Sequence, residues 1–356
     1  MKRVLVIRYG AFGDLVMITP VLRLLKEDGF HVTANIGVQW KDVLLRNPNI
    51  DEFIDHDYRA VPNADLPRHW ELLSKGYRLT GWRNVIDGKN AYAKVAEPFD
   101  SVINLTGSVE TGLLVAEGRD KRYDLQHEER HRLFNVNYYD RTLELSGYGH
   151  MRGVLPELYF SPEEETWAQK FMRQQFGKFV ILWSLSGSAF HKAYVHADPV
   201  AREFLNKHQD ACTVTVGDDF CHMLEWRHSR TIAKAGKWPI RKSMVLAKHV
   251  NLVIGTETGV MNASACFDTP KIVLLSHSSE ENLTKHWKNC TTLVPAVACH
   301  PCHQIHYSRT SCPTDEESLA PVCAAAIKPE ELYTAIEAEY AKWKIKKEAL
   351  HGIPSV

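Results

Sequence analysis

The chain has 356 residues, 43 basic and 43 acidic side chains, no formal net charge and 44% hydrophobic residues. This length is sufficient for two domains of ordinary size, and the hydrophobic content is typical of a protein that folds in water. The balanced charge argues against a dedicated nucleic-acid-binding protein, whose surface usually carries net positive charge.

Neither a signal peptide nor a membrane-spanning segment is expected from the sequence. The first apolar run, Val4–Ile7, ends at Arg8 and is too short for the core of a signal peptide. No apolar run approaches the roughly 20 residues that span a bilayer. We therefore expect a cytoplasmic protein, in which the eight cysteines are thiols or metal ligands rather than disulfides.

The N-terminal stretch predicts a strand, a turn and a helix. Arg3–Arg8 is an apolar strand, and Tyr9–Gly13 is a glycine-containing turn. The helix that follows begins near Asp14, and its apolar residues recur every three or four positions, as on one helix face: Leu15, Ile18, Leu22 and Leu25. Asp14 is either a first-turn acid favoured by the helix dipole or a general base at the end of a parallel strand, where open α/β sheets bind ligands.

Strands and helices continue to alternate along the N-terminal half. The strands expected there are His31–Ile36, Ile50–Ile54 and Ser101–Leu105. The expected helices are Val38–Arg46 and Leu133–Leu145. The segment between residues 56 and 97 is different, because it is rich in charge, aromatic residues and loop formers. It is either functional, since arginine and aromatic side chains suit anionic groups and sugars, or a surface subdomain or oligomer contact.

A second alternating series follows the Gly- and Pro-containing linker at Met151–Pro162. The expected helices are Glu163–Phe176, Asp198–His208, Met223–Ser229, Ser243–Lys248 and Val260–Phe267. The expected strands are Phe179–Leu185, Cys212–Val216, Thr231–Lys234, a run starting near Leu252, and Lys271–Leu275. The alternation predicts an α/β protein with a parallel sheet in each half and a cleft between the halves.

The stretch Pro329–Lys347 predicts one long helix near the C-terminus. Leu332, Ile336 and Tyr340 lie on one face of this helix. Its basic end is either a solvated face or a segment weakly attracted to an anionic membrane, through Lys342, Lys344, Lys346 and Lys347.

Ser186–Ser188 is a small-residue turn that follows a strand. A second turn, Gly255–Gly259, joins a buried strand to a helix and is a candidate for ligand binding. The first N–H groups of a helix are unpaired and its dipole is positive there, so such a turn can hold a phosphate, and its glycines allow close approach. The alternative is an ordinary strand-to-helix turn that binds nothing.

Four cysteines near the C-terminus have the spacing of a metal site. A C-x-x-C pair followed by two further thiols matches a tetrahedral site for zinc or iron, and His300, His303 and His306 could each replace one thiol. We expect a structural metal there and no catalytic metal; the alternative is a set of free thiols in a reducing compartment. The thiols are those of Cys299, Cys302, Cys312 and Cys323.

Four stretches resemble, in order and spacing, segments of the heptosyltransferases, glycosyltransferase family 9. Residues 8–14 (RYGAFGD) resemble the R-x-x-x-x-G-D opening of that family, and residues 252–262 (LVIGTETGVMN) resemble its lvIgnDTGpmH segment. Residues 234–244 (KAGKWPIRKSM) stand where the family has its aGk…sl stretch. Residues 183–188 (WSLSGS), with Lys192, stand where it has a small-residue turn followed by a lysine.

The resemblance implies the GT-B fold, two Rossmann-like domains that face each other across a cleft. The N-terminal domain, residues 1–155 with an insertion at about 56–97, would bind the acceptor. The C-terminal domain, residues 156–328 with the Cys-rich segment 299–323, would bind a nucleotide-sugar donor, and residues 329–356 would form the C-terminal helix. Cysteines recur in this tail of the family, and some protein-modifying members hold an iron in four of them.

The activity that the resemblance implies is inverting transfer of a heptose from an ADP-linked donor to an acceptor hydroxyl. Asp14 would be the general base, and Lys192 would stabilise the charge on the leaving diphosphate. The acceptor is open between a lipopolysaccharide core sugar, a protein hydroxyl and another polymer, and an oligomer is compatible with the sequence. The residues expected to bind the donor are Gly13, Ser186, Gly187, Ser188, Lys192, Glu257, Thr258 and Gly259.

Three departures from the family pattern lie in the donor half. Glu257 stands where the family has Asp, and Asn262 stands where it has His. Residues 276–279 (SHSS) replace a turn that commonly contains glycine. These departures leave the sugar and the nucleotide open, and they motivate an alternative function: a non-catalytic nucleotide-binding or assembly protein on the same fold.

Overall fold

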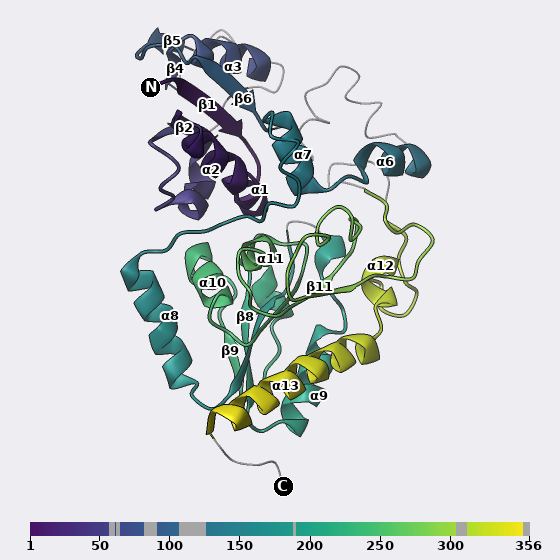
Figure 1. The fold of residues 1–356 in the computed structure, drawn as a ribbon. Helices are drawn as coiled ribbons and strands as arrows, with labels where there is room; N and C mark the ends of the chain where they lie inside the picture. The colour runs from purple at the N-terminus through teal and green to yellow at the C-terminus, as the bar shows by residue number, and fades with distance from the viewer. Residues whose placement is uncertain are drawn as a thin grey trace. The chain divides into compact units, whose positions relative to one another are not determined.

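The computed structural model describes residues 1–56, 61, 65–81, 91–106, 126–187, 190–303 and 312–351. It divides into two compact units, with β1 and β2 (purple) in the first and α8 (teal) and α13 (yellow) in the second (Figure 1). The first unit consists of Met1–Tyr123 and Tyr138–Tyr159, and the second of Asp124–Asn137 and Phe160–Val356. Each unit contains its own parallel sheet, so the predicted α/β class with two Rossmann-like domains is confirmed.

In the first unit, the described strands form a four-stranded parallel sheet in the order β3-β2-β1-β6. Arg3 on β1 is in register with His31 on β2, and Val4 is in register with Ser101 on β6. Because β1 has a neighbour on each side, its apolar run is completely buried. The strands are β1 (Arg3–Arg8), β2 (His31–Gly37), β3 (Glu52–His56) and β6 (Ser101–Asn104).

Two short helices replace the single helix expected after β1. Helix α1 (Phe12–Met17) ends before Ile18, and α2 (Thr19–Glu27) begins directly after it with Pro20 in its first turn. Proline is tolerated in a first turn, but inside a helix it removes a hydrogen bond, which explains the break. The apolar face is nevertheless buried, because Leu15, Ile18, Leu22 and Leu25 are at most 3% exposed.

The described part of the segment between residues 56 and 97 packs on the first sheet. Helix α3 (Leu66–Ser74) precedes an antiparallel hairpin of β4 (Tyr77–Gly81) and β5 (Ala91–Lys94). Leu66 and Leu73 join the core that contains Ile7 of β1. This segment therefore contributes a structural layer, in addition to any role of the residues that lie outside the described ranges.

Other elements of the first unit differ slightly from expectation. The stretch Val38–Leu44 (η1) is a 3₁₀ helix rather than an α-helix. The helix expected at Leu133–Leu145 consists of α6 (His127–Phe134) and α7 (Tyr138–Leu145). Helix α6 belongs to the second unit, although the chain on both sides of its segment belongs to the first.

In the second unit, the described strands form a six-stranded parallel sheet in the order β12-β11-β10-β7-β8-β9. The central strands are buried on both faces, as their continuous apolar runs predict. The strands are β7 (Phe179–Ser184), β8 (Ala211–Val216), β9 (Thr231–Ala233), β10 (Leu252–Thr256), β11 (Lys271–Leu274) and β12 (Cys290–Leu293).

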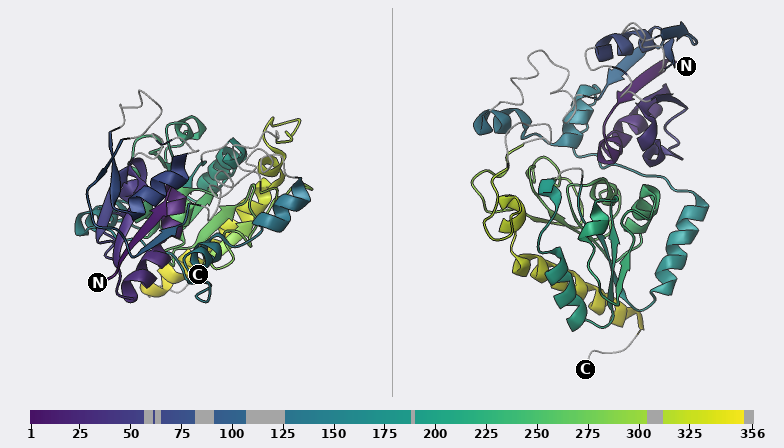
Figure 2. Two further views of the ribbon diagram at one scale, coloured as in Figure 1. Left: turned by 90° about the horizontal axis from the view of Figure 1, so that it is seen from above. Right: turned by 180° about the vertical axis from the view of Figure 1, so that it is seen from behind.

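Two groups of helices accompany this second sheet. Helix α9 (Ala197–Lys207) packs against the long C-terminal helix α13 (Pro329–His351), and α10 (Ile240–Ala247) packs against both α8 (Pro162–Gln174) and α11 (Gly259–Ser264). The C-terminal end of α13 lies near the end of α8 (Figures 1 and 2), because Lys347 Nζ donates to the Gly177 carbonyl at 2.7 Å.

Other parts of the second unit depart from the expected elements. The helix expected at Met223–Ser229 is instead a short 3₁₀ turn, η5 (Cys221–Leu224), followed by irregular chain. Helix α12 (Val322–Ala326) and strand β12 were not predicted. None of the helices in the described part of the chain is both long and apolar enough to cross a membrane.

Replacing the fully buried Ile336 of α13 with alanine should lower the free energy of unfolding by about 2–5 kcal/mol, because apolar contacts are lost and a cavity remains. Ile345 lies on the same helix but is 68% exposed, so Ile345→Ala should change that free energy by less than about 0.5 kcal/mol. Denaturant unfolding followed by tryptophan fluorescence measures both. Equal losses would contradict the packing of α13 described here.

Candidate active site

Three neighbouring parallel strands of the second unit end at one edge of its sheet. Strand β7 ends at Ser184, β10 at Thr256 and β11 at Leu274. Open α/β sheets bind ligands outside the carboxyl ends of their strands. We call residues 185–187, 257–258 and 275–278, which follow these strands, the edge turns. The Ser184 Oγ and Thr258 Oγ1 atoms lie 2.9 Å apart and join the first two of them.

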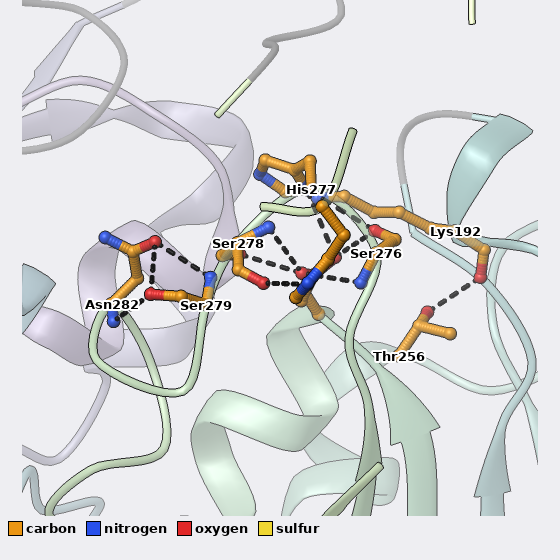
Figure 3. Close-up of polar contacts among 9 residues, drawn as sticks. Lys192, Thr256, Ser276, His277, Ser278, Ser279 and Asn282 are labelled. Carbon is orange, nitrogen blue, oxygen red and sulfur yellow. Dashed lines mark hydrogen bonds and ion pairs between the residues drawn. The ribbon is translucent and has the colours of Figure 1, made fainter. Parts of the chain in front are cut away.

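The turn after β7 places Gly187 beside Lys192. A Cβ atom at Gly187 would lie 2.8 Å from Lys192 Cδ and 3.3 Å from the Glu257 carbonyl oxygen, so glycine lets these groups approach closely. The backbone of Lys192 is held in place because its carbonyl accepts a 2.8 Å hydrogen bond from Thr256 Oγ1 (Figure 3). Lys192 thus lies beside two of the edge turns, whereas Ser188 lies outside the described residues.

Glu257 is buried, and the turn after β11 surrounds its carboxylate. The Ser276 and Ser278 N–H groups each donate to Oε1 at 3.0 Å, and the Ser278 hydroxyl donates to the same oxygen at 2.8 Å. The Ser276 hydroxyl donates to Oε2, and His277 Nδ1 lies 3.1 Å from that oxygen. Figure 3 shows these serine and histidine side chains converging. The oxygens of Glu257 are therefore engaged by the protein itself.

The electrostatic surroundings of Glu257 favour its ionised form. Complete burial by itself would raise the pKa of this carboxyl group. The positive charges of His277 and Lys192, together with hydrogen bonds from His277 and Ser276, outweigh burial and hold the pKa well below its usual range. The edge turns are thus built around a buried negative charge.

Thr258 and Gly259 begin helix α11. The Thr258 side-chain oxygen accepts a 3.2 Å hydrogen bond from the Met261 N–H group and so caps the helix. Asn262 Nδ2 donates to the Thr258 carbonyl at 3.0 Å. Several residues predicted to bind the donor therefore follow neighbouring strands at one edge of the second sheet: Ser186, Gly187, Glu257, Thr258 and Gly259.

Asp14 lies on α1 of the first unit, beside the end of β1, and Gly13 precedes it on that helix. Arg8 Nη2 lies 2.6 Å from Asp14 Oδ1, and the Ala11 N–H group donates to Oδ2 at 2.6 Å. A Cβ atom at Gly10 would lie 2.3 Å from Oδ2, so the turn needs glycine at this position. The Arg8 side chain is 1% exposed and that of Asp14 is 17% exposed. A buried guanidinium therefore orients a carboxylate that solvent still reaches.

Sequence reasoning missed the ion pair of Arg8 and the contact of His277 with Glu257. Arg8 was visible as the first residue of the R-x-x-x-x-G-D match, but its partner was not assigned. His277 was visible only as a departure from the glycine-containing turn of the family. Both signals were present in the sequence, although neither revealed a contact.

The Cys-rich segment begins beside the turn after β11. His300 Nε2 lies 3.0 Å from the Ser278 carbonyl oxygen, and the His303 N–H group donates to the His277 carbonyl at 2.9 Å. Helix α6 also contacts this segment, because Arg130 Nε donates to the Cys302 carbonyl at 2.9 Å. This contact between distant parts of the sequence was not predicted.

The four cysteines lie within electrostatic range of one another. Burial raises the pKa of Cys323 to about 12, with further contributions from Glu257 and the other three thiols. Burial and the charge of Cys299 raise the pKa of Cys312. Across the described ranges, no group of three or more His, Cys, Asp or Glu side chains is arranged to hold a metal ion. The alternative ligand His306 lies outside those ranges.

Comparisons with known proteins identify the fold. No protein-family model matches the sequence, and a search of curated proteins finds no match. A solved glycosyl transferase family 9 structure from Veillonella parvula DSM 2008 is similar, with a TM-score of 0.65 and 18% identity over 96% of this chain and 98% of its own. The Escherichia coli ADP-heptose lipopolysaccharide heptosyltransferase II has a TM-score of 0.62 and 14% identity over 97% of this chain and 100% of its own.

A third similar structure is the iron-containing dodecameric glycosyltransferase TibC from enterotoxigenic E. coli H10407. Its TM-score is 0.58 and its identity 12%, over 96% of this chain and 77% of its own. The chain therefore has the GT-B fold of these glycosyltransferases, as the sequence resemblance implied.

Replacing Glu257 with glutamine should lower the free energy of unfolding, with a larger loss near neutral pH than in acid. Because the pKa of Glu257 in the folded protein lies below its ordinary value of 4.5, the ionised group stabilises the fold above that value. This contribution is lost as the pH falls through the lowered pKa. Denaturant unfolding of both proteins between pH 7 and about 3 measures the difference.

The exposed Glu203 of α9 offers a matched control, and Glu203→Gln should leave stability nearly unchanged at every pH. If the free energies of unfolding of wild type and Glu257→Gln differed by the same amount at pH 7 and at about pH 3, a lowered pKa of Glu257 would be contradicted.

Proposed function

We propose that the protein is an inverting glycosyltransferase that moves a sugar from a nucleotide-sugar donor to an acceptor hydroxyl. The observation that carries this proposal is the gathering of Lys192, Gly187 and the Glu257–Thr258 turn at the carboxyl edge of the second sheet. Solved glycosyltransferases share this fold over nearly the whole chain, which supports the proposal.

The acceptor side of the proposed reaction depends on Asp14. Its carboxylate accepts a hydrogen bond from the acceptor hydroxyl and then takes its proton as that oxygen attacks the anomeric carbon. The bond between that carbon and the donor phosphate oxygen breaks on the opposite face, which inverts the configuration. The ion pair with Arg8 orients this carboxylate, and a carboxylate suits a step in which the proton leaves late, while the sugar already carries positive charge.

The donor side of the proposed reaction depends on Lys192. Its ammonium group stabilises the negative charge that develops on the leaving diphosphate, and N–H and hydroxyl donors of the edge turns assist. We propose ADP-heptose as the donor, because a solved structure with the same fold is that of an ADP-heptose lipopolysaccharide heptosyltransferase II. The acceptor belongs to one of two classes, a glycan such as the lipopolysaccharide core or a protein hydroxyl.

We further propose that Cys299, Cys302, Cys312 and Cys323 hold a structural zinc or iron. The spacing of these four cysteines matches a four-thiolate site, in which a cation would offset the charge of the ligating thiolates, and TibC, with the same fold, is iron-containing. When bound, the metal would cross-link the segment that begins beside the turn after β11. TibC is dodecameric, which supports an oligomer here as well. We propose a cytoplasmic location, with the basic end of α13 as a solvated face.

The first prediction concerns the donor. ADP should raise the melting temperature of the wild-type protein more than UDP or GDP, because a ligand at about 100 times its Kd stabilises the fold by about 2.7 kcal/mol. Lys192→Gln should reduce this shift, whereas Lys170→Gln, on the exposed side of α8, should not. A shift with another nucleotide would retain the proposed reaction and replace the donor. The lack of a shift with all three would favour the non-catalytic alternative.

The second prediction concerns the general base. Asp14→Asn should slow transfer from ADP-heptose at least about 100-fold, because the proton acceptor is lost, while ADP still binds. Asp28→Asn, at the end of α2, should leave transfer unchanged. A lipopolysaccharide core acceptor and a peptide acceptor, assayed in parallel, distinguish the two acceptor classes. Unchanged transfer by Asp14→Asn at saturating donor would refute the assignment of the base.

The third prediction concerns the metal. Protein purified without chelator should contain about one zinc or iron per chain by elemental analysis, as expected for a four-thiolate site. Cys299→Ser should reduce this content, and Cys290→Ser, a cysteine of β12 outside the set, should not. Metal-free protein with four titratable thiols at these positions would instead establish them as free.

A further inference from the structure

Two of the departures from the family sequence pattern contact each other in the structure. Glu257 is one methylene longer than the usual aspartate, and residues 276–279 replace a glycine-containing turn. The Glu257 carboxylate accepts hydrogen bonds from both Ser276 and Ser278. The longer acid and the serine-rich turn therefore form one polar cluster, and neither departure stands alone.

The residue between these serines is held in a defined orientation. His277 Nδ1 lies 3.1 Å from Glu257 Oε2, and the His277 ring packs edge-to-face against His191 with ring centroids 5.3 Å apart. The His303 N–H group fixes the His277 backbone by donating to its carbonyl oxygen. The imidazole thus has an ion-pair partner at one nitrogen and an aromatic neighbour in His191.

The second ring nitrogen of His277 has a different environment. Considering the described residues alone, no hydrogen bond reaches His277 Nε2, and the side chain remains 10% exposed. The Lys192 side chain extends toward His277 (Figure 3), and the charges of both residues act on Glu257. Lys192 and the imidazole of His277 therefore lie near the same carboxylate, whose oxygens are already engaged by the protein.

We propose that His277 binds the diphosphate of the nucleotide-sugar donor through Nε2–H, beside Lys192, and that Glu257 is the positioning residue for His277. This inference rests on the proposed function. Glu257 accepts a hydrogen bond from His277 Nδ1–H and fixes the orientation of the ring, and an anionic ligand favours a proton on Nε2. The Lys192 ammonium group supplies positive charge for the same ligand.

This assignment changes the role of Glu257. A carboxylate that already accepts four hydrogen bonds from serines and one from a histidine has little capacity left for a donor hydroxyl. It would also repel a diphosphate at short range. Glu257 therefore acts on the ligand through His277 and not by contact.

Two substitutions of His277 separate its two nitrogens. In His277→Asn the amide nitrogen lies near the position of Nδ1, so the hydrogen bond to Glu257 is kept and the Nε2 donor is lost. In His277→Gln the amide nitrogen reaches the position of Nε2 instead. Calorimetric titration with ADP should show about a tenfold weaker Kd for His277→Asn, as expected for one hydrogen bond to a charged group, and a smaller loss for His277→Gln.

The outcomes distinguish this inference from the proposed function. Equal ADP affinity of wild type and His277→Asn, with weakened binding by Lys192→Gln, would overturn the inference and leave the function standing. A loss that affects ADP-glucose but not ADP would place His277 at the sugar and also overturn it. Wild-type protein that binds none of ADP, UDP and GDP would remove the proposed function and, with it, this inference.

A double-substitution cycle tests the positioning role. Glu257→Gln should weaken ADP binding about as much as His277→Asn, and the double variant should be no weaker than either single variant, because both remove the same contact. Nitrogen-15 spectra of the His277 ring should change protonation pattern in Glu257→Gln, a signature that a purely structural role would not produce. If the double variant lost as much ADP-binding free energy as the two single variants together, Glu257 would not act through His277.

Discussion

The buried carboxylate of Glu257 is the constraint on which the second unit's candidate site depends. An ionised group without water destabilises a fold by several kcal/mol unless its oxygens are bonded and its charge is offset. Here the turn after β11 supplies two N–H groups and two hydroxyls, and His277 and Lys192 supply positive charge. The turns after β10 and β11 are therefore joined by interactions that cannot be lost singly without leaving a buried charge underbonded.

Each unit contains an ion pair with a deeply buried member, but that member is the cation in the first unit and the anion in the second. In the first unit the cation is buried, and Arg8 leaves the partly exposed Asp14 carboxylate as the chemically accessible group. In the second unit the anion is buried together with His277, and the partly exposed Lys192 is the more accessible group. The first unit thus offers a proton acceptor, and the second offers positive charge for a phosphate. This division corresponds to the acceptor and donor roles that we propose for the two domains.

Local patterns in the sequence predicted most of the fold but not where several helices end. Helix α6 stops at Phe134 because Asn282, from the second unit's turn region, donates to the Phe134 and Val136 carbonyl groups. The region after Leu224 is not helical because Glu225 accepts hydrogen bonds from Thr215 on β8 and from the Ala235 N–H group. In both cases a partner distant in sequence competes with the local helix. The break before α2 is different, because its cause, Pro20, is local, although the prediction of a single helix did not take it into account.

The sequence by itself determined the alternation of strands and helices, the parallel sheets and the positions of Asp14, Lys192 and Glu257 at strand ends. Periodicity, turn residues and motif spacing are local properties, and each is legible without knowing what packs where. Only the tertiary structure decided which group each of these side chains contacts. The serines that engage Glu257 follow the neighbouring strand, 19 and 21 residues away, and α6 packs on a segment more than 170 residues away. Such contacts arise because parallel strands bring the ends of separate segments to one edge, an arrangement that no local pattern encodes.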